Sequence, residues 1–223
     1  MSKDIVPQPN WKDVIHSAAK GIISLVPFGG VIGEMYGYLL VAPYTKRMEE
    51  FLNKFAIKVE QLEQKQALDL DSVLKREKVK TTIAQAYLIW MRNHQAPKKE
   101  ALLNAILNSM ISDDADEDLE LMFLNYIDVF TSSHLEMLEF LYNNEIERKG
   151  GNWSTSLDAK IHKAAISVNP KFADISFFKM ILKDLVERQL IDRMSKNVPE
   201  ETYLGRVVTK MGEYFLNYIK FPN

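Results

Sequence analysis

The 223-residue sequence contains no cysteine, and this absence excludes several kinds of chemistry at once. Disulfide bonds, thiolate zinc sites and cysteine nucleophiles all need a residue that the chain does not have. The absence leaves the redox compartment open, because a chain without thiols is compatible with reducing and with oxidising surroundings.

The chain also lacks a large excess of either charge. It carries 28 lysines and arginines against 30 aspartates and glutamates, which gives a formal net charge of −2. Indiscriminate binding to nucleic acid requires many uncompensated cations, so this balance argues against it. Hydrophobic residues make up 47% of the chain, which supports a sizeable core and argues against disorder. The length fits one large domain or two small ones, since domains commonly contain about 100–200 residues.

The sequence motifs of several enzyme classes are missing as well. There is no GxSxG, no P-loop lysine motif and no strand–GxGxxG–helix unit. The four histidines do not pair at helical spacing, and we interpret each as a surface or helix-cap residue: His16, His94, His134 and His162. The sequence therefore predicts a protein that is not an enzyme, with no catalytic residue, no cofactor and no metal.

An acidic run at residues 113–118 has alternating aspartates, as in a calcium-binding loop. An EF-hand that begins at Asp114 needs glycine at its sixth position and glutamate at its twelfth. Those positions hold Leu119 and Asn125, so the match fails. We expect the carboxylates to cap the next helix, because negative charge at a helix N-terminus complements the helix dipole.

The stretch "PFGGVIGEMYGYLLVAP", residues 27–43, is almost uncharged and has Gly29, Gly33 and Gly37 four residues apart. Glycines at this spacing lie on one helix face, where another backbone can approach closely. The spacing predicts a helix-packing or membrane-engaging hairpin at these three glycines.

The apolar run around this stretch, residues 21–42, has the length of a bilayer-spanning helix, which needs about 20 residues. Pro27 and the glycines after it divide the run, and Glu34 would lie near the middle of a membrane at a considerable energetic cost. We favour a packing helix in a soluble bundle. A hairpin that enters membranes on triggering and a permanent transmembrane helix stay open as alternatives.

Residues 10–130 are predicted to form an antiparallel bundle of helices. After a helix that follows the N-cap Asn10, a second helix is expected from about Gly30, kinked at Pro43, and a later one opens at Pro97. Between the second helix and the one that opens at Pro97 we expect one further helix, which is capped by Asp71 or Ser72. The second helix carries a regular apolar stripe: Tyr44, Met48, Phe51, Leu52, Phe55, Val59 and Leu62.

From Thr131 the pattern predicts three helices, two short strands around the polar loop "SKNVPEE", and a last helix "KMGEYFLNYI". This is the element order of a winged helix-turn-helix. The tail "LGRVVTKMGEYFLNYI" resembles the end of winged-helix domains, where a wing strand leads into a threonine-capped helix. The resemblance implies that residues 131–223 form a winged-helix domain. Eight residues should share its core: Leu135, Leu138, Leu141, Ile161, Ile181, Leu185, Phe215 and Leu216.

A DNA-reading winged helix places several basic and amide side chains on its third helix and basic residues on its wing. Here the candidate nucleic-acid contacts are Lys179 and Lys183 on the helix, and Arg193 and Lys196 on the wing. Acidic residues almost balance the basic ones from Thr131 onward. We therefore favour a protein-binding or dimerising winged helix over a DNA reader.

Residues 11–66 show a second resemblance, carried by "PFGGVIGE" and "APYTKRMEEFL". They resemble the N-terminal part of uncharacterised bacterial helical-bundle proteins and, in outline, the HeLo-like bundles of cell-death effectors, which perforate membranes. This resemblance implies a role in bacterial defence. Composition and periodicity do not indicate such a role.

The sequence thus predicts a mainly α protein: a helical bundle at residues 10–130 and a winged-helix domain with a small β-hairpin at residues 131–223. The leading function is a non-enzymatic effector or interaction protein whose N-terminal hairpin engages a membrane or partner helices. The alternative is a winged-helix DNA-binding transcriptional regulator. We expect a protein partner or a homo-oligomer. The N-terminus does not resemble a signal peptide, so we expect a cytoplasmic protein, with peripheral membrane attachment left open.

Overall fold

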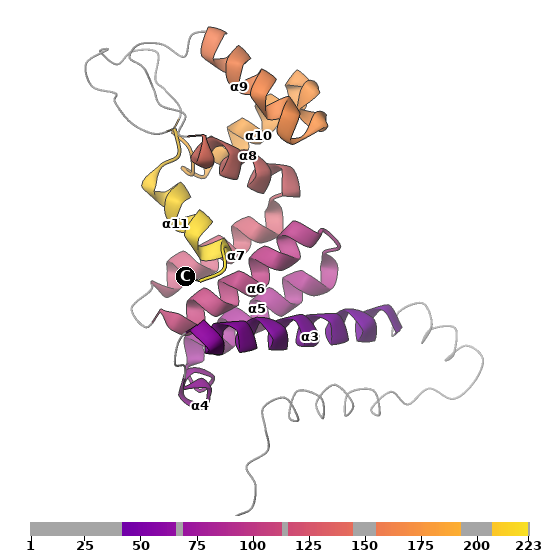
Figure 1. Cartoon of the computed structure of the whole chain (residues 1–223), viewed down its shortest axis with the longest axis vertical. Helices are drawn as coiled ribbons and strands as arrows, with labels where there is room; N and C mark the ends of the chain where they lie inside the picture. The colour runs from indigo at the N-terminus through magenta and orange to yellow at the C-terminus, as the bar shows by residue number, and fades with distance from the viewer. Residues whose placement is uncertain (1–41, 66–68, 113–115, 145–154, 193–206, 223) are drawn as a thin grey trace, which may run out of the picture.

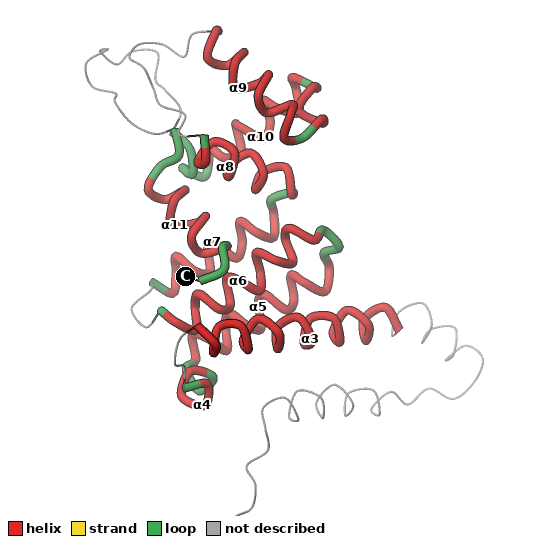
Figure 2. The backbone as a smooth tube through the Cα atoms, in the orientation of Figure 1, coloured by secondary structure: helices red, strands yellow, loops and turns green. Residues whose placement is uncertain are grey.

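The computed structural model describes residues 42–65, 69–112, 116–144, 155–192 and 207–222, and the structural statements below concern these residues. This part of the chain is mainly helical, as predicted (Figures 1 and 2). Its elements are α3 (Ala42–Lys65), α4 (Leu70–Val73), α5 (Glu77–Arg92), α6 (Ala96–Ile111), α7 (Glu117–Val129), α8 (Ser132–Asn143), α9 (Thr155–Val168), the 3-10 helix η2 (Pro170–Ala173), α10 (Ile175–Glu187) and α11 (Lys210–Ile219).

Helix α3 buries most of the apolar stripe that the sequence predicts, because Met48, Phe51, Phe55, Val59 and Leu62 are buried and Leu52 is half-buried. The ring of Phe51 makes edge contacts with Tyr87 and Trp90 of α5, at centroid distances of 5.2 and 5.4 Å. The indole N–H of Trp90 donates to the backbone carbonyl of Arg47 over 3.1 Å, which satisfies its one polar atom. The predicted kink at Pro43 concerns a helix that begins near residue 30, so most of that prediction lies outside the described residues.

The prediction of one helix between α3 and α6 is wrong, because the chain forms the short helix α4 and then the separate helix α5. The side chain of Asp69 caps α4 by accepting from the backbone N–H of Ser72, so neither Asp71 nor Ser72 is the N-cap. After α4, the backbone N–H groups of Lys75 and Arg76 donate to the carbonyl groups three residues earlier in the chain. These tighter bonds end the α-helical turn and separate α4 from α5.

Helix α6 is the central element of the bundle. It lies against α3, α5 and α7, and it also contacts α8 and α11 (Figure 1). Such a helix must be apolar around most of its circumference. Its buried apolar residues are Ala101, Leu102, Leu103, Ala105, Ile106, Leu107 and Met110. Pro97 lies in its first turn, as predicted.

The three helices predicted after Thr131 and the predicted last helix are confirmed. Thr131 precedes α8, and Asn169 with Pro170 ends α9. The carboxylate of Asp174 caps α10, and the hydroxyl of Thr209 accepts from the backbone N–H of Gly212 to cap α11. All eight residues of the predicted core are buried in one cluster: Leu135, Leu138, Leu141, Ile161, Ile181, Leu185, Phe215 and Leu216.

The segment in which two strands were predicted is described only at its ends. Ile191 and Val208 form an isolated antiparallel bridge, which is the only β-pairing among the described residues. The backbone N–H of Asp192 donates to Val207, and that of Thr209 donates to Leu190, both over 3.0 Å. Residues 193–206, with most of the predicted hairpin, lie outside the described residues.

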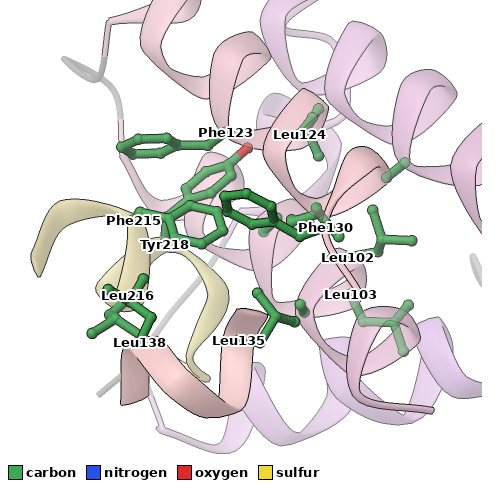
Figure 3. Packing of buried hydrophobic residues seen from close by; sticks show 14 of the residues in the cluster. Leu102, Leu103, Phe123, Leu124, Phe130, Leu135, Leu138, Phe215, Leu216 and Tyr218 are labelled. Carbon is green, nitrogen blue, oxygen red and sulfur yellow. The ribbon is translucent and has the colours of Figure 1, made fainter. Parts of the chain in front are cut away.

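Helix α11 joins the second half of the chain to the bundle. The ring of Phe215 lies 5.3 Å from that of Phe123 on α7, and Figure 3 shows both beside Phe130 and Tyr218. The last carbonyl groups of a helix have no hydrogen-bond partner within the helix. At the end of α11, side chains of α6 donate hydrogen bonds to these carbonyl groups. Asn108 donates to the carbonyls of Tyr218 and Lys220 over 2.8 Å, and Asn104 donates to that of Ile219 over 2.9 Å. The hydrophobic core is therefore continuous from α3 to α11.

Candidate interaction surface

Helix α10 has a buried face and an exposed face. The sequence predicts that Phe178, Ile181, Leu182 and Leu185 face the core. Phe178, Ile181 and Leu185 are buried, whereas Leu182 is half-buried at the edge of the core. On the opposite side the exposed residues are Ile175, Ser176, Lys179, Met180, Lys183 and Glu187, which we call the outer face of α10.

The outer face combines apolar and cationic side chains. Ile175 is 45% exposed and Met180 is 49% exposed, and both belong to the seven exposed large hydrophobic residues of the described part of the chain. Because an α-helix has 3.6 residues per turn, these two side chains flank the row of Lys179 and Lys183. The ammonium of Lys183 lies 3.5 Å from the carboxylate of Glu187, one turn further along. One of the two cations is therefore paired with an anion on the same face.

The turn before α10 is held by hydrogen bonds and ring contacts. The imidazole of His162 on α9 donates to the backbone carbonyl of Phe172 over 2.6 Å, and its ring lies 4.7 Å from that of Phe178. The side-chain oxygen of Asn169 accepts from the backbone N–H of Lys171. These contacts hold η2 between α9 and α10, directly before the outer face of α10 begins.

The N-terminal turn of α8 is a junction between the two halves of the chain. The backbone N–H of Ser132 has no acceptor within the helix and donates to the side-chain oxygen of Gln95 over 3.0 Å. Gln95 lies just before α6. From the other side, the amide of Asn169 donates to the hydroxyl of Ser133 and to the carboxylate of Glu136, over 3.1 and 2.7 Å. The hydrogen bond to Gln95 thus connects the start of α8 with the bundle, and the bonds from Asn169 connect it with α9, η2 and α10.

His134 lies in the same turn and is one of the two kinds of residue that the sequence predicts. It is a cap residue, since its Nδ1 accepts from the backbone N–H of Thr131 over 3.0 Å. It is not a surface residue, because it is only 4% exposed and stacks on Phe130 at 4.7 Å. Its Nε2 lies 3.1 Å from the carboxylate of Asp184 on α10.

Both ring nitrogens of His134 are engaged, so neither is free to accept a proton from a substrate. Burial lowers the pKa of His134, and the hydrogen bond and charge of Asp184 oppose this shift only in part. The arrangement therefore joins two helices and does not form a general base. The Thr-x-x-His spacing was the one sequence signal for this role, because it matches the N-cap and N3 positions of a capping box.

The acidic run acts as a cap where the structure describes it. The carboxylate of Asp116 accepts from the backbone N–H groups of Asp118 and Leu119 at the start of α7, over 3.0 and 3.4 Å. Within the described ranges, no three acidic or histidine side chains gather in a way that could hold a metal ion. Of the helices described, none has the length and apolarity needed to cross a membrane.

The remaining predicted site residues divide into two groups. Lys179 and Lys183 lie on the outer face of α10, exposed as predicted. Outside the described residues lie Gly29, Gly33, Gly37, Arg193 and Lys196. Sequence reasoning missed the apolar part of the outer face, because it assigned α10 its lysines without weighing the exposure of Ile175 and Met180.

Comparison of the chain with protein-family models, with curated proteins and with solved structures finds no match.

Proposed function

We propose that the protein is a non-enzymatic helical interaction protein and that the outer face of α10 binds a protein partner. The observation that carries this proposal is the pair of half-exposed apolar side chains, Ile175 and Met180, on either side of Lys179 and Lys183. Protein interfaces combine an apolar centre with polar groups that set the orientation of the partner. The outer face supplies both within a few turns of one helix.

The surroundings of α10 support this proposal. Interfaces gain affinity when the binding surface is already ordered, because less conformational entropy is lost on association. The contact between His162 and Phe172 orders the turn before α10, and the contact between His134 and Asp184 ties α10 to α8. Contacts within the chain thus order the helix that carries the outer face on both of its sides.

The second candidate function is DNA binding through a winged helix. It is favoured by the order α8, α9, α10, followed by the antiparallel bridge between Ile191 and Val208 and then by α11. In this reading Lys179 and Lys183 contact phosphates, together with Arg193 and Lys196 of the predicted wing. The outer face has no arginine, asparagine or glutamine, which are the usual readers of base edges. We therefore rank this function second.

A salt titration of duplex DNA binding separates the two functions. We expect the wild-type protein to bind only weakly at physiological salt. If it is a DNA reader, Lys179→Ala with Lys183→Ala should flatten the slope of log K against log salt by about 0.9 per lost contact. The matched control, Ile175→Ser with Met180→Ser, alters the same face without changing its charge. A nanomolar, sequence-specific complex that the lysine changes abolish would overturn the ranking.

The N-terminal hairpin is a separate part of the proposal. We propose that its glycine face at Gly29, Gly33 and Gly37 packs in the bundle or in an oligomer and engages a membrane or partner helices when released. The glycine spacing supports the packing, and the resemblance of residues 11–66 to membrane-active effector bundles supports the release and a role in bacterial defence. A leakage assay with anionic liposomes tests the membrane step.

A further inference from the structure

The contact between His134 and its neighbours depends on which ring nitrogen carries the proton. A backbone N–H can only donate, so the Nδ1 that accepts from Thr131 must hold a lone pair. The proton of the neutral ring is then on Nε2, from which it is donated to Asp184 over 3.1 Å. The neutral imidazole therefore satisfies one partner on α8 and one on α10 at the same time.

Protonation would place a second hydrogen on Nδ1, directed at the N–H of Thr131. The hydroxyl of Thr131 also lies 3.0 Å from Nδ1 and could accept that hydrogen. The backbone N–H of Thr131 would still lose its acceptor at the first turn of α8, and because Thr131 is exposed this N–H would then bond to water in place of the ring. Protonation therefore favours the opening of the first turn of α8, although it strengthens the attraction to Asp184.

The charges that act on the ring come from α10 and α6. Asp184 favours the protonated ring, whereas Arg188 at the end of α10 and Lys98 on α6 disfavour it. Lys98 is itself buried and donates to the backbone carbonyl of Asp128 over 2.7 Å. Helices α9 and α11 also pack against α8 but contribute none of these charges. Burial is the largest influence, and it also favours the neutral ring.

We infer that His134 is a pH-sensitive joint: the neutral ring holds the start of α8 to α10, and protonation releases the Thr131 side of this contact. This inference does not depend on the proposed function. If α10 does carry the binding surface, the joint would make the support of that surface sensitive to mild acid, because Asp184 lies one residue from Lys183.

The sign of the pH dependence follows from the direction of the pKa shift. In the unfolded chain a histidine titrates near its ordinary pKa of about 6.5. The folded pKa of His134 is lower, so between the two values the unfolded chain binds more protons. The contribution of His134 to stability is therefore complete above the unfolded pKa and is lost as the pH falls toward the folded pKa.

The test compares His134→Gln with wild type and with His94→Gln, the same change at an exposed histidine. Glutamine at the N3 position of a capping box can still accept from the N-cap N–H, but it does not titrate. The free energy of unfolding is measured with urea from about pH 8 to about pH 5. We expect wild type and His94→Gln to lose stability in parallel, and His134→Gln to lose less. An unchanged slope in His134→Gln overturns the inference.

Should His134→Gln fail to fold, the titration of the His134 ring in the wild-type protein by NMR gives the answer. We expect a pKa below the ordinary histidine value, and loss of hydrogen-exchange protection at the Thr131 amide on the same titration. Asp184→Asn should lower that pKa further, because it removes the one charge that favours protonation. A ring that titrates at or above the ordinary value contradicts the joint.

Discussion

Gly212 on α11 faces the carbonyl group of Leu190 so closely that an added Cβ would lie 2.2 Å from its oxygen. The same oxygen accepts from the backbone N–H and from the hydroxyl of Thr209, over 3.0 and 3.1 Å. The end of the α10 segment and the start of α11 thus meet at a point where no side chain fits.

Gly212→Ala should therefore destabilise the protein by overpacking, by about 1–3 kcal/mol. This sign is informative, because alanine normally stabilises a helix interior relative to glycine by about 1 kcal/mol. Urea unfolding measures the change. Asn217→Ala, at an exposed position of α11, is the control and should change stability little. A more stable Gly212→Ala protein would mean that α11 does not approach Leu190 closely.

Gln189 adopts a left-handed conformation with φ of 58° just after α10. Its N–H bonds to Val186 and that of Leu190 bonds to Leu185, which is the Schellman pattern of a helix end. Gln189→Gly should raise the free energy of unfolding by up to about 1 kcal/mol, because only glycine adopts this conformation without strain. Gln189→Ala removes the same side chain but keeps the Cβ, so it should give no such gain. Equal effects of the two changes would contradict the explanation.

Two lysines of α5 form ion pairs that differ in burial, one with Glu120 of α7 and one with Glu77 of α5. Lys78 lies 3.0 Å from Glu120, and the two side chains are 17% and 5% exposed. Lys80 lies 2.7 Å from Glu77 on the surface. Lys78→Met should cost about 3 kcal/mol or more, because it leaves the Glu120 carboxylate buried without its cation.

The surface pair gives the control for this prediction. Lys80→Met should cost less than about 1 kcal/mol, as exposed ion pairs usually do. The double change Lys78→Met with Glu120→Leu should recover much of the loss, since neither charge of this pair then remains. Thermal or urea unfolding of the four proteins decides the matter. Similar losses for Lys78→Met and Lys80→Met would show that Glu120 is well solvated.

The prediction for the N-terminal glycine face concerns residues outside the described ranges and rests on the sequence alone. Gly33→Leu should destabilise the protein by about 1–3 kcal/mol if another helix packs closely on this face. A rise in melting temperature would show that the face is open. The membrane alternative requires that wild type release dye from anionic liposomes and that Gly33→Leu not do so. Dye release by both proteins would show that leakage does not depend on close packing at Gly33.

Much of the fold could be predicted because its signals are local. The residues Thr131, Asp174 and Thr209 precede α8, α10 and α11 as helix caps, and Asn169 with Pro170 ends α9. Each of these signals acts within a few residues through hydrogen bonds to backbone N–H groups or through the missing N–H of proline. The break between α4 and α5 has no such signal, because no glycine or proline marks the turn, and it was missed.

The contacts that organise the candidate site could not be predicted, since they join distant parts of the chain. His134 and Asp184 are 50 positions apart, and Asn108 reaches the end of α11 across 110 positions. Helical periodicity shows which face of an element is apolar but does not show which other element covers it. For the same reason the exposure of Ile175 and Met180 became evident only once the packing of α10 was known.

Site-specific photocrosslinking shows whether the outer face of α10 contacts a protein. A photoreactive amino acid is placed at Met180 and, as a control, at Leu88, which is 63% exposed on α5. In cells of the native host, we expect a protein adduct from position 180 that is absent from position 88 and that Ile175→Ser abolishes. Crosslinking of position 180 to nucleic acid, or no adduct that distinguishes it from position 88, would show that this face does not bind a protein.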